Sequence, residues 1–444
     1  MKNIAKEPVE IDSRKFYIGL AIALGLHLLL ISLPIALWLD VALFKSWSVE
    51  LARQGLANFY TVVNSDYPPG YLYVLWLLAK IYQLFDPTFS HTDGVLLMAL
   101  IKLPSVLADI GSALVIAQIL KLYTTRDRAY RAALIYAFNP LMIFVSAIWG
   151  QVDGVIVLLM LCAFYLIQQN QVIRAGILIA AMLVVKPQGI FFAPFLVLSQ
   201  WFRQAWWKWG AIALGGATTI WLIIFPFFGV DRFDSNNLSN LSLNSFLYFI
   251  YKPFLSLYYL LQGTANFYSF GSVNAFNIWI WSNWQSDYAT FLGISYRVIG
   301  LGLLGILMMW LTIFLYHQRH FSAHCVAIVT MLVGFFVLPT RMHERYILYS
   351  LAFFAITIAI IPLFKWLYWA FTFTGSINVG YVYLNYNHGE LFNMIPEILR
   401  YSITYITSVL NVILLAGLLI YSIRLQILLG NNISVKNMAV KNEL

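Results

Sequence analysis

Three carboxylate-bearing segments stand at the ends of apolar stretches of the sequence. Asp40 closes the first apolar stretch and precedes Trp47 by seven residues. Asp66 opens the segment 66–70 (DYPPG), in which two prolines fix the direction of the backbone. Asp153 closes the tight polar segment 149–153 (WGQVD). Because a carboxylate is costly to place near lipid, each is a functional candidate, and each could take a proton from a hydroxyl group.

Cationic side chains form a second kind of cluster. The segment 341–345 (RMHER) places Arg341, His343 and Arg345 between two apolar stretches, and Lys186 stands at the end of another. Arginine binds phosphate through a planar fork of N–H donors. Cations aimed at a leaving group stabilise the charge that develops on it. We therefore predict that these four residues contact a phosphate group.

Further polar side chains in the same segments could hold hydroxyl groups of a sugar or of an acceptor. They are Asp66, Tyr67, Gln151, Asp153, Gln188 and Glu344. Each cluster also has a purely structural interpretation. Asp40 would then only end an apolar segment, Asp66 would cap a helix, 149–153 would be a simple turn, and Glu344 would neutralise its own cluster.

These residue types together suit one reaction, the transfer of a sugar from a lipid phosphate to a hydroxyl group. That reaction needs a carboxylate to accept the hydroxyl proton and cations to stabilise the phosphate. It needs no second carboxylic acid, because a phosphate leaves without being protonated. The sequence has no glycine-rich phosphate loop, no metal-ligand spacing and no GxSxG elbow. We predict no metal and no cofactor.

The composition places these segments in a membrane protein. Hydrophobic residues make up 61% of the chain and charged residues 10%, with a mean hydropathy of +0.78. Soluble domains carry roughly 25% charged residues. The net charge of +9 is not gathered on one stretch, so it does not indicate nucleic-acid binding. We expect an all-α polytopic fold.

The apolar stretches predict about 12 transmembrane helices. The basic N-terminal tail indicates a cytoplasmic N-terminus, and alternation from there also places the C-terminus inside. The predicted spans are 16–39, 95–122, 131–148, 154–169, 173–186, 188–201, 209–228, 290–316, 322–339, 346–364, 366–385 and 400–423. Residues 1–350 would form the catalytic module, and 351–444 would add C-terminal helices and a cytoplasmic tail.

Two long segments, 40–94 and 229–289, are predicted to be external loops that carry interfacial helices. The stretch 69–85 within the first loop either crosses the membrane or lies along its surface. The positive-inside rule favours the surface position, because the next basic cluster then falls in the cytoplasm. A second surface helix is expected near 243–262.

A secondary transporter, or a protein that binds or flips lipid-linked sugars, is the alternative class. Transporters place ionisable groups near the midplane of the membrane. Only Asp109 lies well inside a predicted span, and we expect it to be a structural residue paired with Lys102. His27, in the first span, is expected to be a packing residue. Most of the acids lie at predicted external ends, which favours the transferase.

The order of motifs also resembles a known superfamily. Asp40 with Trp47, DYPP at 66–69, KLPSVLAD at 102–109, WGQVD at 149–153, KPQ at 186–188 and HERYIL at 343–348 follow one another along the chain. This order resembles the GT-C glycosyltransferases that use polyprenyl-phosphate sugars. It is similar both to bacterial membrane proteins related to the second mannosyltransferase of GPI-anchor synthesis and to the eukaryotic glucosyltransferases that extend dolichol-linked oligosaccharides. The resemblance covers residues 16 to about 350.

The resemblance implies roles for individual residues. Asp40 would be the catalytic base, and His343 with Glu344 would match a His-Glu-Lys motif near the donor phosphate, with Arg345 in place of the lysine. Lys186 and Gln188 would match a Lys-Gln pair. The chain lacks the histidine of the family's Gly-His-Phe-Gln turn, which leaves the identity of the sugar open.

The resemblance further implies inverting, metal-independent chemistry. We expect a multi-pass protein of the plasma (inner) membrane. The partners would be a polyprenyl-phosphate-linked sugar as donor, a glycan or glycolipid as acceptor, and the lipid bilayer. Mannose is the favoured hexose and glucose the next. The active site would face the external or periplasmic side.

Overall fold

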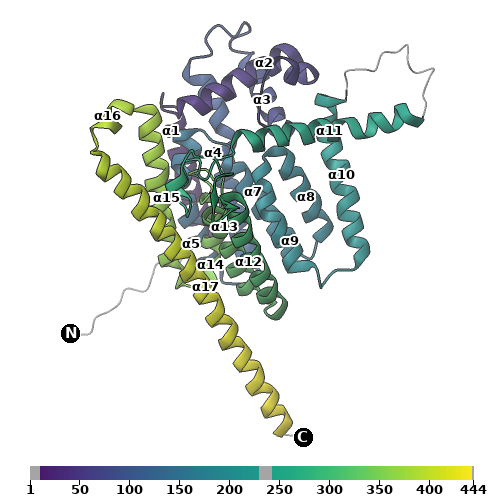
Figure 1. Ribbon diagram of the computed structural model, residues 1–444, viewed down its shortest axis with the longest axis vertical. Helices are drawn as coiled ribbons and strands as arrows, with labels where there is room; N and C mark the ends of the chain where they lie inside the picture. Colours follow the sequence, from purple (N-terminus) through teal and green to yellow (C-terminus); the bar gives the residue numbers. More distant parts are fainter. Residues whose placement is uncertain (1–10, 230–242, 443–444) are drawn as a thin grey trace.

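The computed structural model describes residues 11–229 and 243–442, and these residues form an elongated helical bundle (Figure 1). The α-helices are α1 (Ser13–Ile31), α2 (Trp38–Val62), α3 (Pro69–Tyr82), α4 (Val95–Lys121), α5 (Arg126–Ala137), α6 (Pro140–Ile143), α7 (Asp153–Gln168), α8 (Val172–Val185), α9 (Ala193–Gln200), α10 (Trp206–Phe228), α11 (Leu243–Phe267), α12 (Tyr296–His317), α13 (Phe321–Val337), α14 (Leu348–Ile360), α15 (Phe364–Asn387), α16 (Gly389–Met394) and α17 (Glu397–Asn442). Short elements are the π-helix η1 (Phe144–Trp149), the 3₁₀ helices η2 (Pro187–Phe192) and η4 (Ile280–Ser282), and the hairpin strands β1 (Thr290–Phe291) and β2 (Ile294–Ser295). The all-α prediction is confirmed, with this one small hairpin added.

Five of the described helices are long and apolar enough to cross a membrane, namely α1, α4, α10, α12 and residues 397–424 of α17. Helix α5 and the following α6–η1 segment form a sixth candidate span that is bent by 43°. Four shorter apolar helices, α7, α8, α13 and α14, lie among them. The chain is therefore a multi-pass membrane protein, and the count of about 12 spans stays a prediction.

The centre of the bundle is built from helices that are apolar on all sides. Every residue of α13 from Ala323 to Gly334 is buried, and all residues of α14 from Leu348 to Thr357 are buried as well. A helix that is apolar all round is stable only where other helices or lipid surround it. By contrast, α1, α10 and α12 bury less than a third of their apolar windows, so they form the rim.

Three helices cap one end of the bundle. Helix α2 packs on α3, α3 packs on α8 and α4, and α11 packs on α10. Figure 1 shows α2 and α3 at the top and α11 running across the upper ends of α8 and α10. The predicted helices in the loops 40–94 and 229–289 are thus present, with α11 confirming the helix expected near 243–262. Residues 230–242 of the second loop lie outside the described part.

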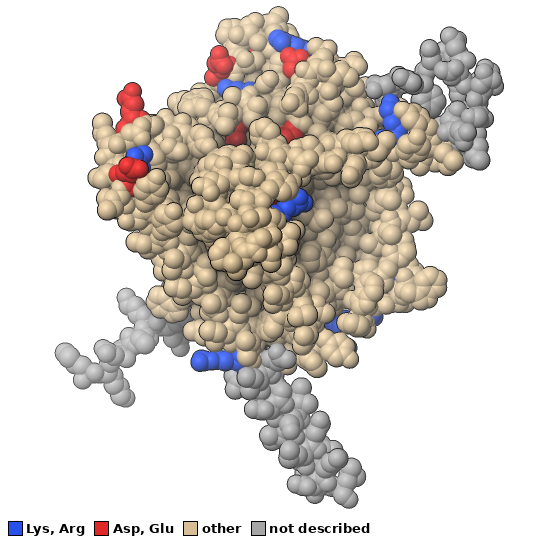
Figure 2. Space-filling model, viewed as in Figure 1, with Lys and Arg blue, Asp and Glu red and all other residues tan. Residues whose placement is uncertain are grey.

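Charged residues are sorted between the two ends of the bundle. On the face shown in Figure 2, every visible Asp and Glu lies in the upper part, and the lower edge shows only Lys and Arg. The positive-inside rule predicts that the end showing only Lys and Arg on this face lies toward the cytoplasm.

Three sequence predictions about the spans need correction. The first helix ends at Ile31, and Asp40 lies in the first turn of α2 rather than at the end of span one. The chain breaks at Pro34, which cannot continue a helix hydrogen-bond ladder. The predicted span 131–148 is bent between α5 and α6 at Pro140. The predicted span 290–316 begins with the hairpin, so its helix starts at Tyr296.

The predicted pairing of Asp109 with Lys102 is also wrong. Asp109 lies 3.6 Å from the Nε2 atom of His27, which reaches it from α1. Lys102 instead donates to the backbone carbonyl of Ile35, in the break before α2. His27 is fully buried, as a packing residue would be.

Candidate active site

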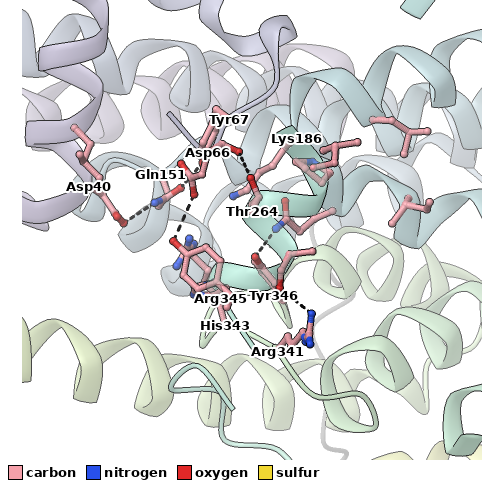
Figure 3. Close-up of a pocket in the computed structure, with 18 of the residues that line it drawn as sticks. Asp40, Asp66, Tyr67, Gln151, Lys186, Thr264, Arg341, His343, Arg345 and Tyr346 are labelled. Carbon is pink, nitrogen blue, oxygen red and sulfur yellow. Dashed lines mark hydrogen bonds between the residues drawn. The ribbon is translucent and has the colours of Figure 1, made fainter. Parts of the chain in front are cut away.

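A polar cavity opens beneath the three capping helices, with a volume of about 390 Å³ (Figure 3). Its wall is made by α2, the 66–67 turn, Gln151, the junction of α8 with η2, α11 and the 341–346 segment. Segments far apart in the sequence therefore meet around one space. The lining residues that can do chemistry are Asp40, Asp66, Tyr67, Gln151, Lys186, Gln188, Thr264, Tyr268, Arg341, His343, Arg345 and Tyr346.

Asp40 is held by two donors from the 149–153 turn. The indole N–H of Trp149 and the amide of Gln151 both donate to Asp40 Oδ2, at 2.7 and 2.5 Å. Among the described residues, none donates to Oδ1. Asp40 is half-buried and lines the cavity. A carboxylate with one oxygen fixed and the other unoccupied is well placed to accept a proton.

The 149–153 turn owes its shape to a π-helix and a glycine. The backbone amides of Gly150 and Gln151 both donate to Val145 O, at 3.1 Å. Gly150 has a φ of 91°, and a Cβ there would lie 2.7 Å from a methyl group of Val41. Only glycine fits both the left-handed backbone and the close contact with α2. This contact brings Gln151 to Asp40.

The 66–70 segment positions Asp66 and Tyr67 through backbone contacts. Thr264 of α11 donates to Asp66 O at 3.1 Å, and Tyr60 donates to Tyr67 O at 2.6 Å. A Cβ on Gly70 would lie 2.4 Å from Val184 O, so glycine allows α3 to approach the end of α8. The sequence DYPPG thus joins three helices at the cavity, which is more than a helix cap requires.

The Asp66 carboxylate and the Tyr67 ring face different surroundings. Tyr268 donates to Asp66 Oδ2 at 3.4 Å, and burial raises the pKa of the Asp66 carboxyl above its usual value. Burial and the negative Asp66 raise the pKa of Tyr268 to about 12, so its hydroxyl stays a donor. The Tyr67 ring packs against Phe44 and Trp47, with ring centroids 5.5 and 5.4 Å away.

Lys186 and Arg345 share a buried carboxylate on the opposite side of the cavity. Lys186 Nζ lies 2.5 Å from Asp153 Oδ1, and Arg345 Nε lies 3.0 Å from Asp153 Oδ2. Tyr349 also donates to Asp153 Oδ1. Arg345 NH1 donates to Glu344 at 2.5 Å. A carboxylate between two cations fixes their direction, and both cations line the cavity.

Asp153 and Glu344 therefore occupy other positions than the sequence predicts. Both were expected to meet sugar or acceptor hydroxyls, yet both are buried and neither lines the cavity. They pair with Lys186 and Arg345 from behind the wall. The structural interpretation of Glu344, neutralisation within its own cluster, describes its position correctly.

Arg341 and His343 both line the cavity, and neighbouring residues affect each of them differently. Arg341 is bound by both oxygens of Asp287, at 2.6 and 3.1 Å. Burial, together with Arg345 and Lys186, lowers the pKa of His343 well below its usual value. His343 is therefore neutral at physiological pH, and it would meet a phosphate as a hydrogen-bond donor rather than as a cation.

Gln188 lines the cavity and has one side-chain oxygen without a partner. Its amide donates to Tyr346 OH at 2.6 Å, and its Oε1 is buried with no partner among the described residues. Buried polar atoms are normally hydrogen-bonded, so this oxygen is an exception in the wall of the cavity. Among residues 11–229 and 243–442, no three His, Cys, Asp or Glu side chains gather as a metal site.

Five residues of the site escaped the sequence analysis. Thr264 and Tyr268 come from α11 and the residue after it, and Asp287 comes from an irregular loop, where no pattern marks them. Tyr346 and Tyr349 follow the 341–345 cluster and lie on the same side of the chain as Arg345. Residues three positions apart on a helix are neighbours, so the spacing of these two tyrosines could have indicated that both lie near the cluster.

The fold and the cavity are those of a multi-pass membrane protein with carboxylates and cations gathered at one end. The model of glycosyltransferase family 87 matches residues 66–339, more than half of the chain, and the chain therefore belongs to this family. It is a glycosyltransferase of the GT-C-like kind, as the motifs indicate. Asp40 and the 341–345 cluster lie outside the matched range. A search of curated proteins gave no match.

Proposed function

We propose that the protein transfers a hexose from a polyprenyl-phosphate sugar to an acceptor hydroxyl on the external side of the membrane. The observation that carries this proposal is the arrangement of one cavity, which places Asp40 on one side and Lys186 and Arg345 on another. The reaction needs a base and phosphate-binding cations around one space, and these residues line one cavity.

The donor phosphate would lie against Arg345 and Lys186. Both cations are oriented by Asp153, so their positions are set before the donor arrives. His343 adds a neutral donor, and Arg341 adds a guanidinium that Asp287 partly neutralises. Apolar residues of the same cavity, Leu183, Ile190 and Leu261, would contact the isoprenoid chain.

The acceptor hydroxyl would approach Asp40. Its oxygen attacks the anomeric carbon while its proton passes to the carboxylate of Asp40. The bond from the anomeric carbon to the phosphate oxygen breaks, and the phosphate leaves with the electron pair. Attack from the face opposite the phosphate inverts the configuration, so a β-linked donor gives an α-linked product. Asp66, Tyr67, Gln151 and Gln188 would bind the hydroxyl groups of the two sugars.

The proposal is tested with purified protein and synthetic short-chain polyprenyl-phosphate mannose, followed by the glucose donor. Mannose comes first because of the motif resemblance. We expect release of free polyprenyl phosphate, and a chelator should leave the rate unchanged because no step uses a metal. Folded protein that releases no polyprenyl phosphate from mannose, glucose or pentose donors would contradict the proposal.

A further inference from the structure

A second polar cavity lies at the opposite end of the bundle from the candidate site. Helix α7 links the two, because Asp153 at its start belongs to the site and Gln168 at its end lines this cavity. The cavity has a volume of about 380 Å³. It is lined by Tyr123, Ile167, Gln168, Asn170, Gln200, Arg203, Gln204, Arg319, Phe321 and His324.

The lining of this cavity is cationic without any acid. Arg203 and Arg319 line it, and no described Asp or Glu does. Arg203 NH2 donates to the backbone carbonyl of Arg319 at 3.0 Å, and Arg319 Nε donates to Tyr316 O at 3.1 Å. Neither guanidinium forms an ion pair with a carboxylate in the described part of the chain. Each therefore keeps donors and a full charge for an anion.

The inner wall of the cavity carries buried polar side chains. His324 and Gln200 are 5% and 3% exposed, although both carry polar side chains. Gln168 joins His324 through a contact of 3.4 Å between its amide and Nδ1. The rings of Tyr123 and Phe321 stack with centroids 3.6 Å apart. The wall therefore presents polar groups beside the two arginines.

Exposed aromatic residues show the level of the cavity relative to the membrane. Trp201, Phe202, Trp206 and Trp207 are 55%, 61%, 85% and 52% exposed; the first two lie in the α9–α10 connection that also carries Arg203, and the last two begin α10. Tryptophan gathers at the boundary between lipid and water. The α9–α10 connection lies at the lower end of the bundle (Figure 1), where the lower edge of the face in Figure 2 shows only Lys and Arg, so we place the two arginines at the depth of lipid headgroups.

From these observations we infer that the cavity binds the phosphate headgroup of an anionic phospholipid of the surrounding bilayer. Two arginine forks supply charge-assisted hydrogen bonds to the phosphate, and the aromatic residues contact the glycerol and the upper acyl chains. The rule that positive residues lie inside would be met by exposed arginines that do not line this cavity, as at Arg126 and Arg128; Arg203 and Arg319 are also exposed, but they line the cavity together. It does not require a cavity free of carboxylates.

The test uses the full-length protein in zwitterionic phosphatidylcholine nanodiscs, with increasing fractions of phosphatidylglycerol. Thermal unfolding and native mass spectrometry report bound lipid. We expect phosphatidylglycerol to raise the unfolding midpoint and to stay bound in the wild type. The double variant Arg203→Gln/Arg319→Gln should need about tenfold more of the anionic lipid for the same effect.

The matched control is Arg126→Gln/Arg128→Gln, which removes the same charge from exposed positions at the same end. It should respond as the wild type does. An equal loss in both double variants, or an equal shift from inorganic phosphate alone, would overturn the inference. If the first variant does not fold, Arg319→Gln alone decides the question, because the bond from Arg203 to the backbone of residue 319 remains. The rise of the unfolding midpoint with phosphatidylglycerol must then be smaller in Arg319→Gln than in the wild type.

Discussion

Asp40 lines the cavity and Asp153 lies buried behind its wall, and their surroundings give the two carboxylates different chemistry. Asp40 accepts two hydrogen bonds on one oxygen and meets the cavity with the other. Asp153 is fully buried and accepts bonds from Lys186, Arg345 and Tyr349. The first can exchange a proton with a ligand, whereas the second holds two cations in place.

Removing the charge of Asp153 should therefore act on stability before it acts on binding. The change Asp153→Asn leaves Lys186 and Arg345 buried with less compensation, and we expect a loss of about 3–5 kcal/mol. Chemical unfolding in detergent measures it. Asp93→Asn, at an exposed position, is the control and should change stability by less than about 0.5 kcal/mol. Equal effects of the two changes would contradict the described ion pairs.

His343 should make the folded protein sensitive to acid. Its folded pKa is lowered, so below about pH 6.5 the unfolded chain binds a proton that the folded chain does not. Stability should fall by up to about 1.4 kcal/mol per pH unit below that point and recover above it. Unfolding midpoints of the wild type and His343→Asn, measured against pH, report the difference. The control is the same change at His388, which is exposed and forms no ion pair in the described part of the chain; the difference from the wild type should be absent there.

At the scale of elements, the contact between α3 and α8 positions the 66–67 turn. Gly70→Ala would place a methyl group 2.4 Å from Val184 O, and backbone cannot move aside cheaply. We expect a loss of about 1–3 kcal/mol and weaker substrate binding. Gly263→Ala in α11 is the control, because nothing lies within 4 Å of its Cβ position. That change should be neutral or slightly stabilising. A destabilisation shared by both variants would argue against a specific α3–α8 contact.

The sequence predicts most helices well, because apolar stretches and basic loops mark them directly. It failed at the end of the first helix, where Pro34 breaks an apolar run that continues to Leu39. Hydropathy averages over such a break, and the proline was the available signal. The pairing of Asp109 with His27 joins residues 82 positions apart, and local spacing carries no information on such contacts.

The site residues that the sequence predicts are those at the ends of apolar stretches of the chain. Asp40, Asp66, Gln151, Lys186, Gln188, Arg341, His343 and Arg345 all reach one cavity. The sequence could not tell which acids face the cavity, because burial depends on packing. The sequence also gives no indication that Asp287, in an irregular loop, pairs with Arg341.

At the scale of the whole molecule, the two ends differ in charge and in kind of cavity. The candidate active site lies beneath α2, α3 and α11 at one end, and the cavity of Arg203 and Arg319 lies by the α9–α10 connection at the other (Figure 1). On the face in Figure 2 the acidic residues lie only toward the first of these ends. This polarity predicts a fixed orientation in the membrane, with the candidate site outside.

Single cysteines can test this orientation after Cys162 and Cys325 are replaced by alanine. A cysteine at Asp93 should react with a membrane-impermeant maleimide in intact cells. A cysteine at the position of Arg128 should react only after the cells are permeabilised. Both native residues lie at exposed positions, so access depends on the side of the membrane alone. The reverse pattern would place the candidate site in the cytoplasm and contradict the orientation.

The most direct test of the account compares the wild type with Asp40→Asn in donor binding and in turnover. Asparagine keeps the size of the side chain and can still contact Trp149 and Gln151, but it cannot accept the proton. We predict that the dissociation constant for the donor, polyprenyl-phosphate mannose or its glucose counterpart, stays within about threefold of the wild-type value. The rate of transfer should fall by about 10²-fold or more. Transfer close to the wild-type rate in folded variant protein would show that Asp40 is not the base.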